Sequence, residues 1–211
     1  MQKAKTCMRL EEAGVFAIVR TPDKEEAARI CEALLAGGVD TMEVSYTFFN
    51  AGETIRYLKE RFGDRMLIGA GTVLDGETCR DAINHGAEFV IAPNFSEAAC
   101  KCCNRYQIPY APGCTSITEA VNALEAGASF IKCFPICDFY GPDLVRAFRT
   151  PIPWMPLMGS GGVTLENLHI YLENGMSCCG ISRLLTKGSS EQITENARAV
   201  KEIVKNVRNC K

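Results

Sequence analysis

The sequence contains no long apolar run, which excludes a protein that spans a membrane by helices. No apolar stretch in the 211-residue chain reaches the ~18 residues that such a helix needs. The first fourteen residues, MQKAKTCMRLEEAG, carry charges along their length and hold no apolar core. We therefore expect neither a secretory signal nor a membrane partner, and we expect a cytoplasmic protein.

A strong excess of charge of one sign is also absent. The 23 basic residues nearly balance the 25 acidic ones, and no run of lysine or arginine is longer than two residues. Proteins that bind nucleic acid need a basic patch or stripe to neutralise phosphates. The composition therefore argues against nucleic acid and leaves a small molecule as the expected partner.

Histidine is scarce and cysteine is abundant, with two and twelve residues respectively. Cys100 and Cys103 form a C-x-x-C motif on a predicted helix, but no second pair of ligands stands at a spacing typical of zinc sites. His85 and His169 fall on predicted helices and are not expected to be catalytic. We favour reduced, buried thiols over a metal or redox site, although nothing in the sequence explains so many cysteines.

A repeated unit organises the chain: a helical segment ends at a glycine, and a short apolar strand follows. Glycine supplies the left-handed turn that ends a helix, and the clearest examples are Gly38, Gly86, Gly127 and Gly175. Each interval between them has room for another strand and helix. Eight strands are predicted in all, over residues 15–19, 39–45, 66–70, 88–92, 109–112, 129–134, 155–158 and 177–181.

Helices are predicted between the strands, and an extra amphipathic helix is predicted at residues 3–13, before the first strand. Strands that alternate with helices pair in parallel. Because the strands are short and no nucleotide-binding glycine fingerprint is present, a closed (β/α)8 barrel of the TIM type fits better than an open doubly wound sheet. We predict an α/β protein with a single barrel domain over residues 1–211, which agrees with the range of about 200–250 residues typical of such barrels.

Lys132 is the first candidate for chemistry, because it interrupts the apolar strand SFIKCFP. Side chains alternate along a strand, so Phe130, Lys132 and Phe134 share one face. Burial lowers the pKa of a lysine, and a neutral amine attacks carbonyl groups. The residues alone leave two interpretations open, a lysine that forms a Schiff base and a lysine held in a salt bridge.

Glu43 is the second candidate, and alternation places it on one strand face with Thr41 and Ser45. An acid among apolar residues near the end of a strand is a candidate general base. A structural ion pair with Lys132 is the other interpretation, and such a pair would titrate as one coupled unit.

Further polar residues follow the strands at the end where barrels of this class carry their active sites. The loops after strands seven and eight often bind phosphate, because glycine N–H groups and a helix N-terminus attract negative charge. Here the phosphate candidates are Ser160, Gly161 and Gly162 after strand seven and Ser182 after strand eight, although a tight turn alone would also explain the glycines. The same end of the predicted barrel carries Arg20, Thr47, Thr72 and Asn94.

Five segments of the chain match the KDPG/KHG aldolases, a family that the chain resembles over nearly its whole length. KDPG is 2-keto-3-deoxy-6-phosphogluconate, and KHG is 4-hydroxy-2-oxoglutarate. The matching segments are EVS at 43–45, GAGTVL at 69–74, PG at 112–113, FIKCFP at 130–135 and GGV at 161–163. The resemblance implies a class I aldolase, a lyase without metal or cofactor, that assembles as a homotrimer and serves carbohydrate metabolism through the Entner–Doudoroff pathway.

The resemblance also implies a role for each matching residue. Lys132 would form the Schiff base, and Glu43 would shuttle protons. Thr72 would contact the pyruvate part of the substrate, in a pocket shaped by Pro93 and Phe134. The phosphate-binding positions would be Gly161, Gly162 and Ser182, together with Ser160, where threonine is common in the family.

One departure from the family pattern concerns the carboxylate of pyruvate. Many members read E-V-T-L-R after strand two, where the arginine anchors that carboxylate, whereas this chain reads E-V-S-Y-T and ends the segment with Thr47. A threonine hydroxyl cannot give the bidentate, charge-assisted contact of an arginine. Either Arg20 takes over this role, or hydroxyl and backbone N–H groups hold the carboxylate.

The expected reaction is the cleavage of 2-keto-3-deoxy-6-phosphogluconate into pyruvate and glyceraldehyde 3-phosphate through an imine on Lys132. The galactonate stereoisomer and unphosphorylated 4-hydroxy-2-oxoglutarate are alternative substrates. Two other classes stay open: a phosphosugar isomerase or epimerase, which would form no imine, and a barrel that binds a phosphorylated sugar acid without turnover.

Overall fold

The strands form where short runs of valine, isoleucine and alanine are buried on both faces, a pattern typical of parallel sheets covered by helices. The computed structural model describes residues 1–134 and 140–209. Within these ranges the strands are β1 Val15–Val19, β2 Thr41–Ser45, β3 Leu67–Gly71, β4 Val90–Ile91, β5 Tyr110–Ala111, β6 Gly113–Cys114, β7 Ile131–Cys133, β8 Leu157–Ser160 and β9 Cys178–Ile181.

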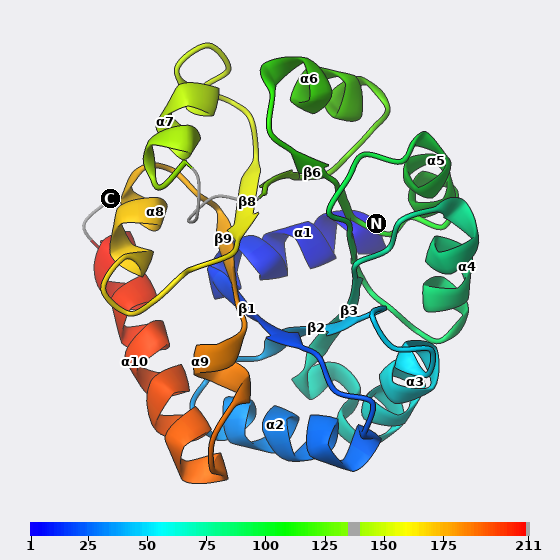
Figure 1. Ribbon diagram of the computed structural model, residues 1–211, viewed down its shortest axis with the longest axis vertical. Coiled ribbons are helices and arrows are strands. Elements are labelled where there is room, and N and C mark those ends of the chain that lie inside the picture. Colours follow the sequence, from blue (N-terminus) through cyan, green and yellow to red (C-terminus); the bar gives the residue numbers. More distant parts are fainter. Residues whose placement is uncertain (135–139, 210–211) are drawn as a thin grey trace.

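Helices lie around the outside of the strands, except that the first helix lies across one end of the barrel (Figure 1). They are α1 Gln2–Ala13, α2 Lys24–Ala36, α3 Ala51–Phe62, α4 Gly76–Asn84, α5 Glu97–Arg105, α6 Ile117–Glu125, α7 Asp143–Arg149, α8 Leu168–Glu173, α9 Arg183–Thr186 and α10 Ser190–Asn209, with a 3-10 turn η1 at Gly63–Arg65. In the part of the chain that the structure describes, none of these helices combines the length and the apolar character needed to cross a membrane.

The strands pair in parallel in the order β5-β4-β3-β2-β1-β9-β8-β7-β6. The two outer members, β5 and β6, are consecutive in the sequence and are separated only by Pro112. A proline lacks the N–H that a strand ladder needs, so it divides one strand into two short pieces. The ring therefore closes through this divided strand, and the predicted eight-position α/β barrel with its extra N-terminal helix is confirmed.

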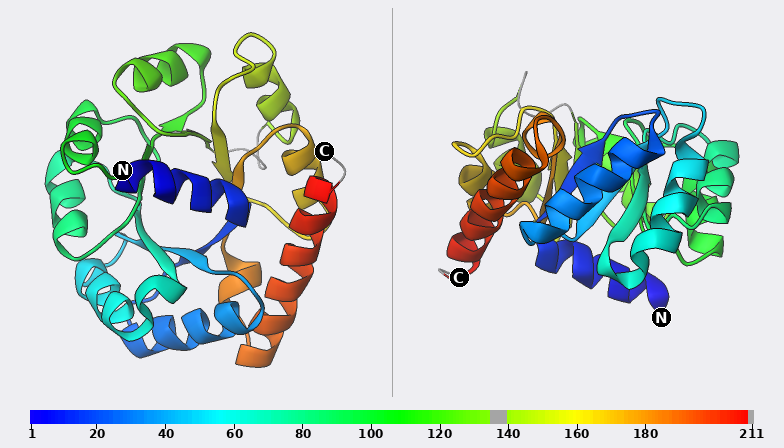
Figure 2. Two further views of the ribbon diagram at one scale, coloured as in Figure 1. Left: turned by 180° about the vertical axis from the view of Figure 1, so that it is seen from behind. Right: turned by 90° about the horizontal axis from the view of Figure 1, so that it is seen from below.

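α1 covers the end of the barrel at which the strands begin, as the rear view in Figure 2 shows. The helix leads through Gly14 directly into β1, and its Leu10 is only 1% exposed. Leu10 packs with the inward-facing side chains of the strands, which are Phe16, Ile18, Leu67, Phe89, Ile91, Ala111, Phe130, Met158 and Cys178. This apolar plug leaves the opposite end, where the strands finish, as the place for a site.

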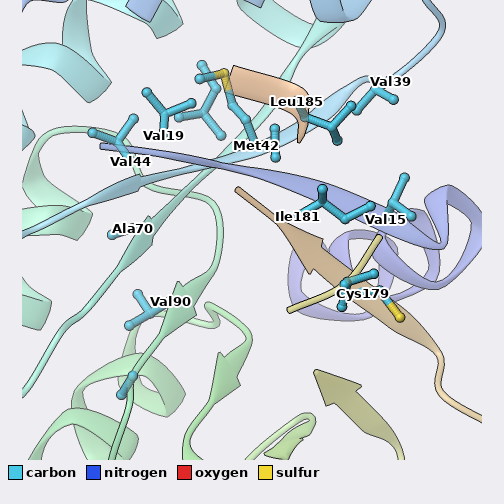
Figure 3. Packing of buried hydrophobic residues seen from close by; sticks show 14 of the residues in the cluster. Val15, Val19, Val39, Met42, Val44, Ala70, Val90, Cys179, Ile181 and Leu185 are labelled. Atoms are coloured by element: carbon cyan, nitrogen blue, oxygen red, sulfur yellow. The ribbon is translucent and has the colours of Figure 1, made fainter. Parts of the chain in front are cut away.

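A second and larger apolar cluster fills the space between the strands and the outer helices (Figure 3). Met42 and Val44 of β2 belong to it. Because side chains alternate along a strand, the other residues of β2, Thr41, Glu43 and Ser45, point toward the barrel axis. The two clusters therefore decide which polar side chains enter the barrel.

Candidate active site

Glu43 and Lys132 lie inside the barrel on opposite walls. On the path through β1, β9 and β8, three strands separate β2 from β7, and β3, β4 and the divided strand separate them on the other path. Glu43 is 2% exposed and Lys132 is 7% exposed. The fold therefore buries both side chains in the interior of the same barrel.

Burial shifts both groups toward their neutral forms. It raises the pKa of the Glu43 carboxyl above the ordinary value, while the positive charges of Lys132 and Arg20 act in the opposite direction. Burial lowers the pKa of the Lys132 amine; Glu43 opposes this shift, and Arg20 adds to it. The amine is thereby suited to attack a carbonyl group, and the carboxyl is suited to hold and release a proton.

The surroundings of the two groups leave room for reaction. The Oε2 atom of Glu43 is buried and has no hydrogen-bond partner among the described residues. The Nζ atom of Lys132 lies 4.4 Å from the centroid of the Phe134 ring, and no ion pair within 4.0 Å is found for it among the described residues. Phe134 thus lies beside Lys132.

Gly71 makes the space that the Glu43 carboxylate occupies. Gly71 ends β3 and pairs in register with Ser45 of β2. A Cβ atom at this position would come within 2.5 Å of the carboxylate carbon of Glu43. Of the small residues in the GAGT segment, Gly71 therefore makes room for the carboxylate of Glu43, whereas a Cβ atom at Gly69 would meet Phe89.

Three hydroxyl groups are connected at the open end of β2 and β3. The Oγ atom of Ser45 and the Oγ1 atom of Thr72 lie 2.9 Å apart, and the Thr47 hydroxyl donates to Ser45 over 3.3 Å. Thr72 has a φ of 62°, in the left-handed region that a β-branched residue rarely adopts, and strain of this kind is common at functional sites. Sequence reasoning named Thr47 and Thr72 as site residues and placed Ser45 on the strand face of Glu43, but it did not predict that Ser45 joins the two threonines.

The phosphate candidates line a pocket of about 540 Å³ at the ends of β8, β9 and β1. Gly161 and Gly162 have φ values of 101° and 68°, which a residue with a side chain rarely adopts. Ser160 is 3% exposed, ends β8 and directly precedes these two glycines. Other lining residues include Arg20, Phe134, Thr164, Glu166, Ser182 and Arg183, and the last of these is a cation that the sequence reading did not single out.

Arg20 lies on the phosphate side of the site. Its guanidinium donates to the Ser182 hydroxyl over 3.4 Å. Its charge also acts on the pKa values of both Lys132 and Glu43. Arg20 therefore lines the pocket and at the same time influences the buried lysine and acid.

Of the remaining residues considered from the sequence, Pro93 lies at the end of the barrel that carries the pocket, whereas the two histidines lie outside the pocket. Pro93 is half-buried just after β4, and its carbonyl group packs against Gly113, at the same end of the barrel as Thr72. His85 ends α4 and bonds to Asp81, and His169 lies on α8, so neither histidine enters the pocket. Among the described residues, no three His, Cys, Asp or Glu side chains converge in a way that would hold a metal ion.

Comparison with known proteins gives one consistent result. The sequence model of the KDPG and KHG aldolase family matches residues 7–203. The 2-dehydro-3-deoxy-phosphogluconate aldolase of Treponema pallidum is 32% identical over 201 residues, covering 92% of this chain and 95% of the relative. The 2-dehydro-3-deoxy-6-phosphogalactonate aldolase of Escherichia coli is 32% identical over 187 residues, covering 88% and 91%.

A solved structure extends the likeness to three dimensions. KDPG aldolase from Legionella pneumophila, with pyruvate captured at low pH as a covalent carbinolamine intermediate, superposes with a TM-score of 0.83. The identity is 26%, and the match covers 95% of this chain and 98% of that one. The likeness therefore spans the whole barrel.

Proposed function

The chain belongs to the KDPG and KHG aldolase family, and we propose that it cleaves 2-keto-3-deoxy-6-phosphogluconate into pyruvate and glyceraldehyde 3-phosphate by class I chemistry. The observation that carries the proposal is the position of Lys132, a buried amine of lowered pKa that faces Glu43 across the barrel. Family membership favours this aldolase chemistry over the isomerase and the non-catalytic barrel.

The first step is the attack of the neutral Lys132 amine on the C2 ketone. The C–N bond forms and gives a carbinolamine, and loss of water then gives a protonated imine. The carbinolamine that pyruvate forms in the Legionella relative supports this kind of step. The protonated imine is the electron sink for cleavage, so we propose that no metal and no cofactor are needed.

Glu43 moves the protons in the following steps. Its carboxylate takes the proton of the C4 hydroxyl, the C3–C4 bond breaks, and the electron pair moves to the imine nitrogen to leave an enamine. Glyceraldehyde 3-phosphate departs. Glu43 returns a proton to C3, and hydrolysis of the imine releases pyruvate and the free amine. The raised pKa of the buried acid supports both directions of transfer.

The two ends of the substrate use different parts of the site. We propose that Ser160, Gly161, Gly162 and Ser182 hold the phosphate together with Arg20, whose bond to Ser182 supports this assignment. The connected hydroxyls of Thr47, Ser45 and Thr72 stand beside Glu43 and would hold the pyruvate carboxylate in place of the missing arginine. Pro93 and Phe134 would bound the space between these ends.

The galactonate stereoisomer is a second candidate substrate. The Escherichia coli relative named for it matches this chain at 32% identity, the same value as the Treponema pallidum relative. The two substrates differ in configuration at C4, the carbon whose hydroxyl Glu43 would deprotonate. Unphosphorylated 4-hydroxy-2-oxoglutarate would be a weaker substrate, because it leaves the phosphate pocket unfilled.

A direct assay tests the proposed activity. The purified chain would be given the gluconate and the galactonate compounds separately, and pyruvate would be followed with lactate dehydrogenase and NADH. Pyruvate release that disappears in Lys132→Ala and survives EDTA would support the proposal. Turnover that persists in a folded Lys132→Ala protein would contradict it.

We also propose a homotrimer in the cytoplasm. The loops that follow β2 and β3 expose two large apolar side chains, Phe49 completely and Leu74 by about half. Exposed apolar groups of this kind are typical of surfaces covered in an assembly. Light scattering coupled to size-exclusion chromatography would test the assembly, and a monomer mass would contradict it.

A further inference from the structure

Cys79 and Cys103 form a close thiol pair outside the active site. Cys79 lies on α4 and Cys103 on α5, and both are fully buried. Their sulfur atoms are 3.3 Å apart. The two residues are far apart in the sequence, so the packing of neighbouring helices brings them together.

The C-x-x-C motif of α5 is divided between two environments. Cys100 directs its thiol to the carbonyl oxygen of Ala126, 3.3 Å away, and so faces α6. Cys103 faces α4 instead. The sequence motif therefore does not describe a reactive pair, whereas the pair Cys79–Cys103 is visible only in the fold.

Within the pair, the contact between the two sulfur atoms favours the thiolate form of Cys79 over that of Cys103. Hydrogen bonds from the Cys103 and Cys102 thiols lower the pKa of Cys79. The same contact and burial raise the pKa of Cys103. A thiolate is the nucleophilic form of cysteine. Of the three thiols, that of Cys102 lies closest to solvent, because this residue is 7% exposed and the other two are fully buried.

We propose that Cys79 and Cys103 are a modification site at which hydrogen peroxide converts the two thiols into a reversible disulfide. The distance between the sulfur atoms must shorten from 3.3 Å to about 2.05 Å, a change that a small shift of two packed helices can supply. In the part of the chain that the structure describes, no three His, Cys, Asp or Glu side chains are arranged to hold a metal ion, which favours this chemistry over metal binding.

The reaction balances in two steps. The Cys79 thiolate attacks one peroxide oxygen, the O–O bond breaks, and the departing hydroxide takes up the thiol proton to form water. Cys79 is then a sulfenic acid. The Cys103 sulfur attacks it, the S–S bond forms, the S–O bond breaks, and the hydroxide leaves as a second water with the Cys103 proton. The two sulfurs lose two electrons, and the peroxide is reduced to water.

The test uses the full-length, fully reduced protein and hydrogen peroxide. After treatment, free thiols are alkylated with iodoacetamide, and the intact mass and the peptide map are measured. The proposal predicts a species with two fewer alkylated cysteines than the twelve of the reduced chain, a peptide that joins Cys79 to Cys103, and loss of that peptide after dithiothreitol. No disulfide, or one that joins other cysteines, would overturn the proposal.

Matched serine variants separate this pair from the C-x-x-C motif. Cys79→Ser and Cys103→Ser are each expected to abolish the disulfide, whereas Cys100→Ser is expected to leave it unchanged. Far-UV circular dichroism confirms that each variant is folded, and either of the first two suffices if the other does not fold. A disulfide lost in Cys100→Ser and kept in Cys79→Ser would refute the assignment.

Discussion

Gly71 and Glu43 face each other across the β2–β3 pair, and the absence of a side chain at Gly71 is what lets the carboxylate lie in the barrel. A Cβ atom on Gly71 would stand within 2.5 Å of both the carboxylate carbon and one of its oxygens. The backbone of one strand thus fixes the position of the acid on the next. The proposed proton shuttle depends on this contact as much as on the acid itself.

Gly71→Ala is therefore expected to displace Glu43 and to lower kcat by roughly 10²-fold, because small misplacements of a catalytic group have effects of this size. Imine formation with pyruvate should survive, since Lys132 lies on the opposite wall. The lactate dehydrogenase assay and borohydride trapping measure the two properties separately. An unchanged kcat in a folded Gly71→Ala protein would show that the position of Glu43 does not matter.

Glu43→Gln is expected to keep the shape of the site and to remove the proton carrier. Turnover should fall on the order of 10²–10⁴-fold, the usual contribution of a general acid–base group. Pyruvate should still be trapped on Lys132, because the first attack needs only the neutral amine. If the variant turns over at the wild-type rate, the base must be another group.

The rate of imine formation is expected to fall as the pH drops through the lowered pKa of Lys132, because the amine then becomes protonated. Arg20→Ala removes a cation that favours the neutral amine, so the pKa of Lys132 rises and the acidic limb moves to higher pH. Arg183→Ala is the matched control, since Arg183 lines the same pocket while the charges that shift Lys132 are those of Glu43 and Arg20. A shift in the control, or none in Arg20→Ala, would contradict this account.

Thr47 is the proposed contact for the carboxylate and Arg20 the proposed contact for the phosphate. Their substitutions are expected to have different effects when the ligand lacks a phosphate. With pyruvate alone, measured on the pH plateau, Thr47→Val should weaken imine formation by about 10-fold, which corresponds to the loss of one hydrogen bond of about 1.4 kcal/mol. Arg20→Ala should weaken the binding of the phosphorylated substrate much more than the binding of pyruvate. The opposite pattern would make Arg20 the carboxylate anchor.

Much of this fold follows from local sequence signals. Apolar runs, four of them placed after helix-ending glycines, predicted the place of each strand except the piece Gly113–Cys114, which lies beyond the predicted end at residue 112. Alternation predicted which residues share a strand face with Glu43 and with Lys132. The division of the fifth strand at Pro112 was less visible, because its flanking residues continue the same strand pattern. The division depends on the single N–H that Pro112 lacks, and the hydrophobic periodicity of the sequence does not reveal that loss.

The details of the site depend on contacts between distant segments. Ser45 joins Thr47 to Thr72 only because β2 and β3 pair in one particular register. The bond from Arg20 to Ser182 arises because β1 and β9 are neighbours in the closed ring. The spacing of residues in the sequence does not show which strands pair or in which register. These contacts could therefore be found only in the structure.

The measurement that tests the central claim most directly is the mass of the intact protein after incubation with pyruvate and borohydride, followed by peptide mapping. The account predicts one reduced pyruvate adduct per chain, located on Lys132 and absent from Lys132→Ala. Turnover of the sugar acid with no adduct, or with the adduct on another lysine, would contradict the account and return Lys132 to a structural role.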